Sequence, residues 1–168
     1  MSNKFKLNWG IWIGIVTGIY VFLYLNSPLA QYGIIWVTFI ALPIFFNGGA
    51  QRKDFFAYGV SSILGVVWGL IFLFFIGIFA QVMNENLATA LSCLIFTACV
   101  CLHMMVPDKF LFNKVPAMFG GIAATFSQGG ENFIPIMITL VLGDIVAVLC
   151  SEGTKFLHPD GTWKFLKK

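Results

Sequence analysis

The sequence predicts an all-α polytopic membrane protein, and the prediction depends on composition, on the length of the apolar segments and on where the charges fall. Of the 168 residues, 59% are hydrophobic and 10% are charged, whereas soluble domains carry about 25% charged residues. A soluble fold of this length could not bury so much apolar surface, so we expect the chain to sit in a lipid bilayer.

Six apolar segments qualify or nearly qualify as membrane spans, which need about 20 mostly apolar residues. They cover residues 9–25, 31–47, 55–82, 87–106, 115–128 and 132–151. The loops between them are short, so neighbouring spans must run antiparallel. We therefore expect residues 1–157 to form one transmembrane helical domain. Residues 158–168 then form a short cytoplasmic tail, where Trp163 and Phe165 beside lysines are typical of a membrane interface.

The basic residues indicate the orientation of the spans. They precede the first span or follow the second, fourth and sixth: Lys4, Lys6, Arg52, Lys53, Lys109, Lys114, Lys155, Lys164, Lys167 and Lys168. If all six segments cross, every base lies on one side, and the other side carries Glu85 and Glu131. Because cytoplasmic loops are enriched in lysine and arginine, we expect both termini in the cytoplasm.

The fifth segment, residues 115–128, is short for a span. About 14 residues rise only about 21 Å in a helix. Two arrangements stay open: the segment crosses while enclosed by other helices, or it enters the membrane and returns on the same side. A returning segment would place the C-terminal lysines outside, so the charge distribution favours six crossings.

Small residues recur every fourth position in several spans, which places them along one helix face. Such residues let helix backbones approach closely in a membrane. They predict a compact bundle, and they mark either helix packing or a subunit interface. The strongest sets are Gly10, Gly14 and Gly18 in the first span and Ser61, Gly65 and Gly69 in the third. The first of these is the best candidate for an interface, so we expect a homo-oligomer.

Two similar interruptions suggest a 3+3 inverted repeat. The second span ends in Asn47-Gly48-Gly49 and the fifth in Gln128-Gly129-Gly130, and a Leu-Gly pair follows in the next span at Gly65 and at Gly143. Three helices per half is an odd number, so the halves would have opposite orientations. Inverted repeats of this kind place a solute site near the midplane at the repeat interface.

Asp144 is the one ionisable side chain near the centre of a predicted span. A carboxylate there costs about 2.5–3.5 kcal/mol on insertion scales, so it should face the bundle interior or water. It either binds a solute, a cation or a proton, or it makes a structural hydrogen bond to Ser61, to Ser62 or to another subunit. The residues expected to line a solute path are Asn47, Gly120, Gly121, Thr125, Gln128 and Asp144.

No motif points to catalysis, a metal or a cofactor. The chain lacks G-x-S-x-G, H-E-x-x-H and P-loop patterns, and its four cysteines are expected to be small packing residues. No basic cluster with interleaved aromatic residues points to nucleic acid. We therefore expect a protein that is not an enzyme and has no cofactor, metal or nucleic-acid partner.

Three stretches resemble a known family. They are Val115–Gly130, Ala41–Gly49 and Gly65–Trp68. The most specific is the V-P-x-x-F-x-G-x-x-A-T-F pattern that begins at Val115. Together they resemble the domain-of-unknown-function 1097 family of small bacterial inner-membrane proteins, over about residues 9–157. The resemblance implies a bacterial cytoplasmic membrane and carries over no functional residues.

Two functions remain as hypotheses. The first is a small homo-oligomeric channel or transporter for a small neutral or weakly charged solute, because the predicted path is polar but nearly free of charge. The second is a non-transporting scaffold or regulatory subunit of a partner complex, because every small-residue stripe could serve as an interface.

Overall fold

The computed structural model describes residues 1–165, and it confirms the all-α prediction. Six α-helices follow one another: α1 (Asn3–Leu25), α2 (Thr38–Asn47), α3 (Phe55–Phe79), α4 (Glu85–Cys101), α5 (Val115–Ser127) and α6 (Phe133–Glu152). Short 3-10 turns join several of them. Lys167 and Lys168, which were predicted to lie in the cytoplasm, are outside the described residues.

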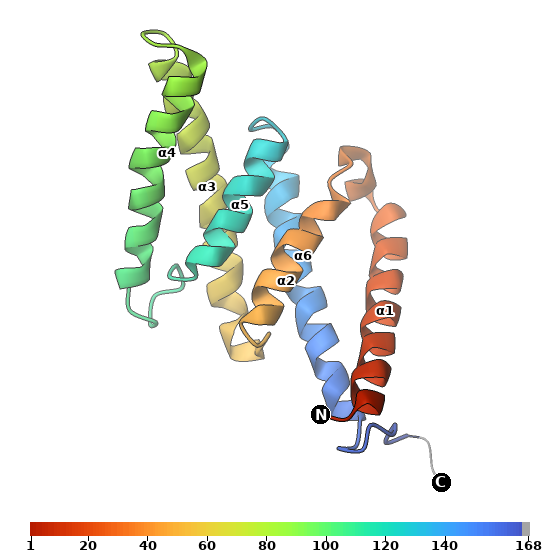
Figure 1. Cartoon of the computed structure of the whole chain (residues 1–168). Coiled ribbons are helices and arrows are strands. Elements are labelled where there is room, and N and C mark those ends of the chain that lie inside the picture. The colour runs from red at the N-terminus through yellow and green to blue at the C-terminus, as the bar shows by residue number, and fades with distance from the viewer. Residues whose placement is uncertain (166–168) are drawn as a thin grey trace.

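Four of the helices, with their adjoining turns, are long and apolar enough to cross a membrane. They are Asn3–Leu25, Arg52–Phe79, Glu85–Met105 and Phe133–Phe156. The other two apolar helices, Ile35–Asn47 and Val115–Ser127, are shorter. At 1.5 Å per residue α2 and α5 are about 15–20 Å long, so neither matches the roughly 30 Å hydrocarbon layer. Both lie between longer helices (Figure 1).

The second short helix begins later than its apolar pattern predicts. The predicted segment started at residue 31, but residues 28–32 form a 3-10 turn that ends at Gly33 in the left-handed region, with φ of +64°. The chain enters α2 only at Thr38. A left-handed residue breaks the helical hydrogen-bond pattern, so the apolar run is divided between a turn and a helix.

Both termini lie at one end of the bundle, together with the α2–α3 and α4–α5 loops (Figure 1). These are the parts of residues 1–165 that hold the lysines and arginines. We call this end the basic end. Helix α5 leads from the basic end towards the opposite end, and α6 returns (Figure 1). Within the bundle the fifth segment therefore runs from one end towards the other and does not turn back.

The main contacts between helices join one half of the chain to the other. Helix α5 packs mainly against α3, and α2 packs mainly against α6, while α3 and α6 contact each other. The outer helices follow the same rule, because α4 lies on α3 and α1 lies on α6. Each short helix is therefore held by the long helix of the opposite half.

Residues at corresponding positions in the two halves make these contacts. A Cβ atom on Gly65 would overlap the Met118 carbonyl group of α5, and one on Gly143 would lie 2.6 Å from the Thr38 carbonyl oxygen of α2. One turn further along, Gly69 faces Thr125. At the corresponding place in the other half, Ala147 packs with Phe45. These paired contacts are the arrangement expected of an inverted repeat.

The two short helices also end in the same way. The amide of Ala50 donates to the Phe45 carbonyl at 3.0 Å, and the amide of Gly130 donates to the Thr125 carbonyl at 3.1 Å. Phe45 therefore corresponds to Thr125, and Gly48 corresponds to Gln128. The predicted match between Asn47 and Gln128 is displaced by one residue. Matching the two amide side chains was misleading, because the backbone hydrogen bonds define the register of the reversal.

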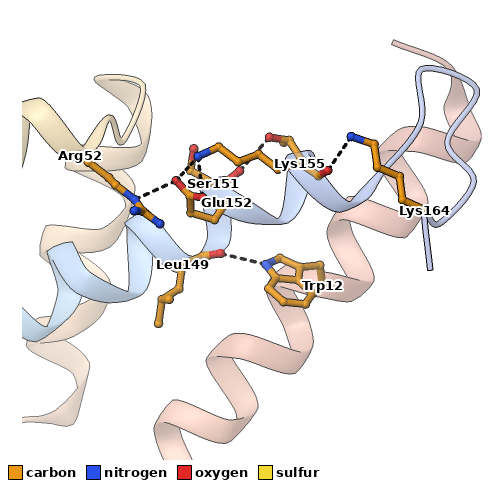
Figure 2. Close-up of polar contacts among 8 residues, drawn as sticks. Trp12, Arg52, Leu149, Ser151, Glu152, Lys155 and Lys164 are labelled. Carbon is orange, nitrogen blue, oxygen red and sulfur yellow. Dashed lines mark hydrogen bonds and ion pairs between the residues drawn. The ribbon is translucent and has the colours of Figure 1, made fainter.

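Contacts between distant parts of the chain hold the basic end together (Figure 2). The Glu152 carboxylate lies 3.1 Å from Arg52 Nε and 2.7 Å from Lys155 Nζ. The indole of Trp12 donates to the Leu149 carbonyl at 2.9 Å, which joins α1 to α6. The tail packs back onto α1, where Asn8 donates to the Gly161 carbonyl at 2.8 Å.

Candidate functional site

Asp144 lies inside the bundle, on the part of α6 that faces α3. Its side chain is buried, with 1% of the residue exposed. One carboxylate oxygen, Oδ2, has no hydrogen-bond partner among the described residues. A buried carboxylate oxygen normally accepts a hydrogen bond, because leaving it bare is costly. The missing partner makes Asp144 the centre of the candidate site.

Ser61, one of the predicted structural partners of Asp144, is engaged elsewhere. Its hydroxyl donates to the Leu111 carbonyl at 3.3 Å and accepts from the Lys114 amide at 3.1 Å. Ser61 therefore fixes the loop that leads into α5. A hydroxyl group has only one proton to donate, and the proton of Ser61 is used in this loop.

Gly59 of α3 lies beside the Asp144 carboxylate. A Cβ atom on Gly59 would lie 3.9 Å from Asp144 Oδ2 and 3.9 Å from Val141 Cγ2. The absent side chain leaves space at the face of the oxygen that lacks a partner. Tyr58 precedes Gly59 in α3.

A cavity of about 310 Å³ opens at the basic end, next to Tyr58. Its lining comes from the end of α2, the start of α3 and the start of α5: Pro43, Ile44, Asn47, Gly48, Tyr58 and Pro116. Tyr58 packs over the end of α2, where its hydroxyl lies against Gly48 and its ring centroid is 4.6 Å from that of Phe45. Tyr58 thus lines this cavity together with Asn47, and the next residue of α3, Gly59, lies beside Asp144.

Three other predicted path residues lie in helix contacts. A Cβ atom on Gly120 would be 2.9 Å from Ile44 of α2, and one on Gly121 would overlap the backbone of α3. Thr125 is buried and donates to the Gly121 carbonyl at 2.9 Å. These residues let α5 approach its neighbours. Gln128 lies at the opposite end of the bundle and donates to the Ser127 carbonyl at 3.3 Å.

The predicted interface residues fall into two groups. Ser61, Gly65 and Gly69 are buried within the chain, on the face of α3 that meets α5 and its leading loop. Gly10, Gly14 and Gly18 lie on the outer face of α1, and a Cβ atom on any of them would meet nothing within 4 Å. Only the second group is free to contact another molecule.

The two halves differ in chemistry around the crossing of α3 and α6. Since Gly65 corresponds to Gly143, Val66 corresponds to Asp144. Val66 packs in an apolar cluster with Ile136 and Leu140 of α6. Ile136 and Leu140 correspond to Tyr58 and Ser62 of α3, so these two α3 residues are the expected neighbours of Asp144. The inverted repeat is therefore polar on the side of the basic end and apolar on the opposite side.

Sequence reasoning missed Tyr58 and Gly59. Matching Gly65 with Gly143 does not find them by itself, because the α3 positions opposite Asp144 follow only from the packing of Val66 against Ile136 and Leu140. It also missed two hydroxyl pairs that join α1 to the bundle. Tyr24 and Thr139 lie 2.9 Å apart, and Tyr20 is hydrogen-bonded to Thr38.

Comparisons with known proteins identify the family but not an activity. No curated protein and no solved structure matches the chain. A family model described as "Protein of unknown function (DUF1097)" matches residues 10–155, which include all the residues of the candidate site. The chain is a membrane-like helical bundle that belongs to the DUF1097 family.

Proposed function

We propose that this protein transports a small neutral or weakly charged solute across a membrane, along a path between its two repeats. The observation that carries the proposal is the buried Asp144 carboxylate, which has an oxygen without a partner at the contact between the repeats. Intramembrane ionisable residues are costly, and they mark solute or ion pathways more often than structural positions.

The cavity at the basic end supports this proposal. It brings Asn47 and Tyr58 to one cavity, and Tyr58 is followed in α3 by Gly59, which lies beside Asp144. A volume of about 310 Å³ is at the lower limit of ordinary ligand pockets. Such a space suits a solute of a few heavy atoms, and no catalytic group is needed for transport.

The expected setting is a bacterial inner membrane, with the basic end in the cytoplasm. The support is the distribution of lysine and arginine, because cytoplasmic loops carry an excess of these residues. The outer face of α1 supports homo-oligomer formation. Its three glycines have open space beside them, which would let the α1 helix of a second copy approach closely.

Flux through reconstituted vesicles tests the proposal. Purified protein in proteoliposomes should pass at least one class among small amides, ammonium salts and short carboxylic acids, as measured by stopped-flow light scattering. Asp144→Val should abolish that flux and leave the helical content unchanged, because the corresponding Val66 is accommodated in the other half. Folded protein that gives no flux above empty vesicles for any of these solutes would contradict the proposal.

The scaffold hypothesis is the second candidate, and the exposed α1 glycines favour it equally. It predicts that a different membrane protein co-purifies in a fixed ratio and that Asp144→Val does not change any flux. Loss of this partner on replacing Gly14 by leucine, with vesicle flux absent, would select the scaffold over the transporter.

A further inference from the structure

We propose that Asp144 binds a small cation that donates N–H hydrogen bonds, such as ammonium or a short protonated alkylamine. This inference rests on the proposed transport function and names the class of its solute. It is argued from the charge around Asp144, the hydrogen-bonding capacity of the carboxylate, the neighbouring aromatic rings and the space beside Gly59.

The charge of Asp144 is not balanced by any base that contacts it among residues 1–165. The described ion pairs join Arg52 and Lys155 to Glu152, and Lys114 to Asp108 at 3.5 Å. Isolated buried charges are costly unless a partner neutralises them. A bound cation would supply the missing positive charge at the contact between α3 and α6.

The hydrogen-bonding capacity of Asp144 defines what the cation must offer. An ionised carboxylate only accepts hydrogen bonds, and its Oδ2 atom has no donor among the described residues. The ligand must therefore donate. A hard metal ion is a poorer fit, because it takes six or more oxygen ligands, and the described chain brings together no group of three histidine, cysteine, aspartate or glutamate side chains.

Aromatic rings near the carboxylate favour an ammonium-type cation. Tyr58 precedes Gly59 in α3, and its ring centroid lies 4.6 Å from that of Phe45, which packs with Ala147 one turn along α6 from Asp144. The faces of aromatic rings attract ammonium groups. An alkylammonium ion would place its charge near Asp144 and its carbon atoms against these rings.

The space for such a ligand is small and lies on the α3 side. A Cβ atom on Gly59 would be 3.9 Å from Asp144 Oδ2, which is ordinary van der Waals contact. Gly59→Ala should therefore be tolerated by the fold, but its methyl group would occupy the space in which a donor must approach Oδ2. Gly77 of the same helix is the matched control, because a Cβ atom there meets nothing within 4 Å.

Binding of methylammonium to the full-length protein in detergent tests the inference without depending on transport. We expect saturable binding of radiolabelled methylammonium to the wild type, and at least tenfold weaker binding to Asp144→Asn and Asp144→Val. Gly59→Ala should also weaken binding tenfold while its thermal unfolding temperature stays at or above that of the wild type. Gly77→Ala should bind as the wild type does.

The binding and flux results separate this inference from the proposed function. Binding that survives in Asp144→Val, or is unchanged in Gly59→Ala, would overturn the inference. Flux of a neutral amide without any methylammonium binding would also overturn it, and would leave the transport proposal standing. Methylammonium binding that is lost in the Asp144 variants, without flux of any solute, would support the site and contradict transport.

Discussion

Replacing Gly65 by alanine should weaken the bundle more than the same change at most other helical glycines. The new methyl group would lie 2.7 Å from the carbonyl carbon of Met118 and closer still to its oxygen. Because the obstacle is backbone, no side-chain rotation can relieve the overlap, and α3 and α5 must separate. That separation also loosens the contact of Gly69 with Thr125, one turn away.

The magnitude follows from two opposing effects. Overpacking of a close contact costs about 1–3 kcal/mol, and the upper end applies because the backbone itself must move. Alanine regains about 1 kcal/mol over glycine in helix propensity. The expected net loss for Gly65→Ala is therefore about 2 kcal/mol of unfolding free energy. At Gly77, where a Cβ atom meets nothing within 4 Å, only the gain remains.

Gly143→Ala provides the comparison in the other half. Its methyl group would lie 2.6 Å from the Thr38 carbonyl oxygen and 2.8 Å from Ala41 Cβ. We therefore expect Gly143→Ala to lower the free energy of unfolding as well, by somewhat less than Gly65→Ala does. The assay is reversible unfolding in mixed detergent micelles, followed by helical circular dichroism. Equal stability of Gly65→Ala and Gly77→Ala would refute the close helix crossing on which the repeat depends.

Three further predictions concern the surface and the two ends of the bundle. Gly14→Leu should convert a homo-oligomer to monomers without loss of helical content, because a Cβ atom at Gly14 meets nothing within 4 Å; size-exclusion chromatography with light scattering measures this. Cysteines that replace Lys109 and Glu131 in a cysteine-free chain should react with a membrane-impermeant maleimide from opposite sides of the bilayer, and labelling of both from one side would contradict the orientation. The pKa of Asp160 is held below its usual value by the backbone and side-chain hydrogen bonds from Thr162. The stabilisation of the tail by these hydrogen bonds is therefore present above the ordinary carboxyl pKa of about 4 and is lost as the pH falls through the lowered pKa. Trp163 fluorescence should report this loss. Asp160→Asn should remove the pH dependence.

Much of the fold follows from the sequence because lipid imposes simple demands on it. The apolar segments, their alternating directions and the location of the bases required no knowledge of packing, and Asp144 was correctly placed in the interior. The start of α2 was wrong, because the apolar pattern continues through Gly33 while the backbone leaves the helix there. Hydropathy does not distinguish an apolar turn from the first residues of a helix.

The candidate site could be predicted only in part. A small residue indicates that something approaches closely, but not what approaches. Gly121 was predicted to line a path, yet it meets the backbone of α3. Tyr58 carried no visible signal because a single aromatic residue in an aromatic-rich chain is unremarkable. Its importance depends on the contact between α3 and α6, which no local pattern contains.

The asymmetry between the repeats indicates which side of the path is open. Symmetry relates the residues that line the cavity at the basic end to Ala123, Ala124, Ser127, Gln128, Ile136 and Trp36. On that opposite side Ala124 and Ile136 are both 0% exposed, in the cluster that holds Val66. Alternating access in transporters of this kind moves one repeat against the other around a fixed site. Under the proposed function, the cavity that Tyr58 lines is the entrance from the basic end. Access from the other end requires the contacts of Ala124 and Ile136 to separate, while Tyr58 closes over Asp144.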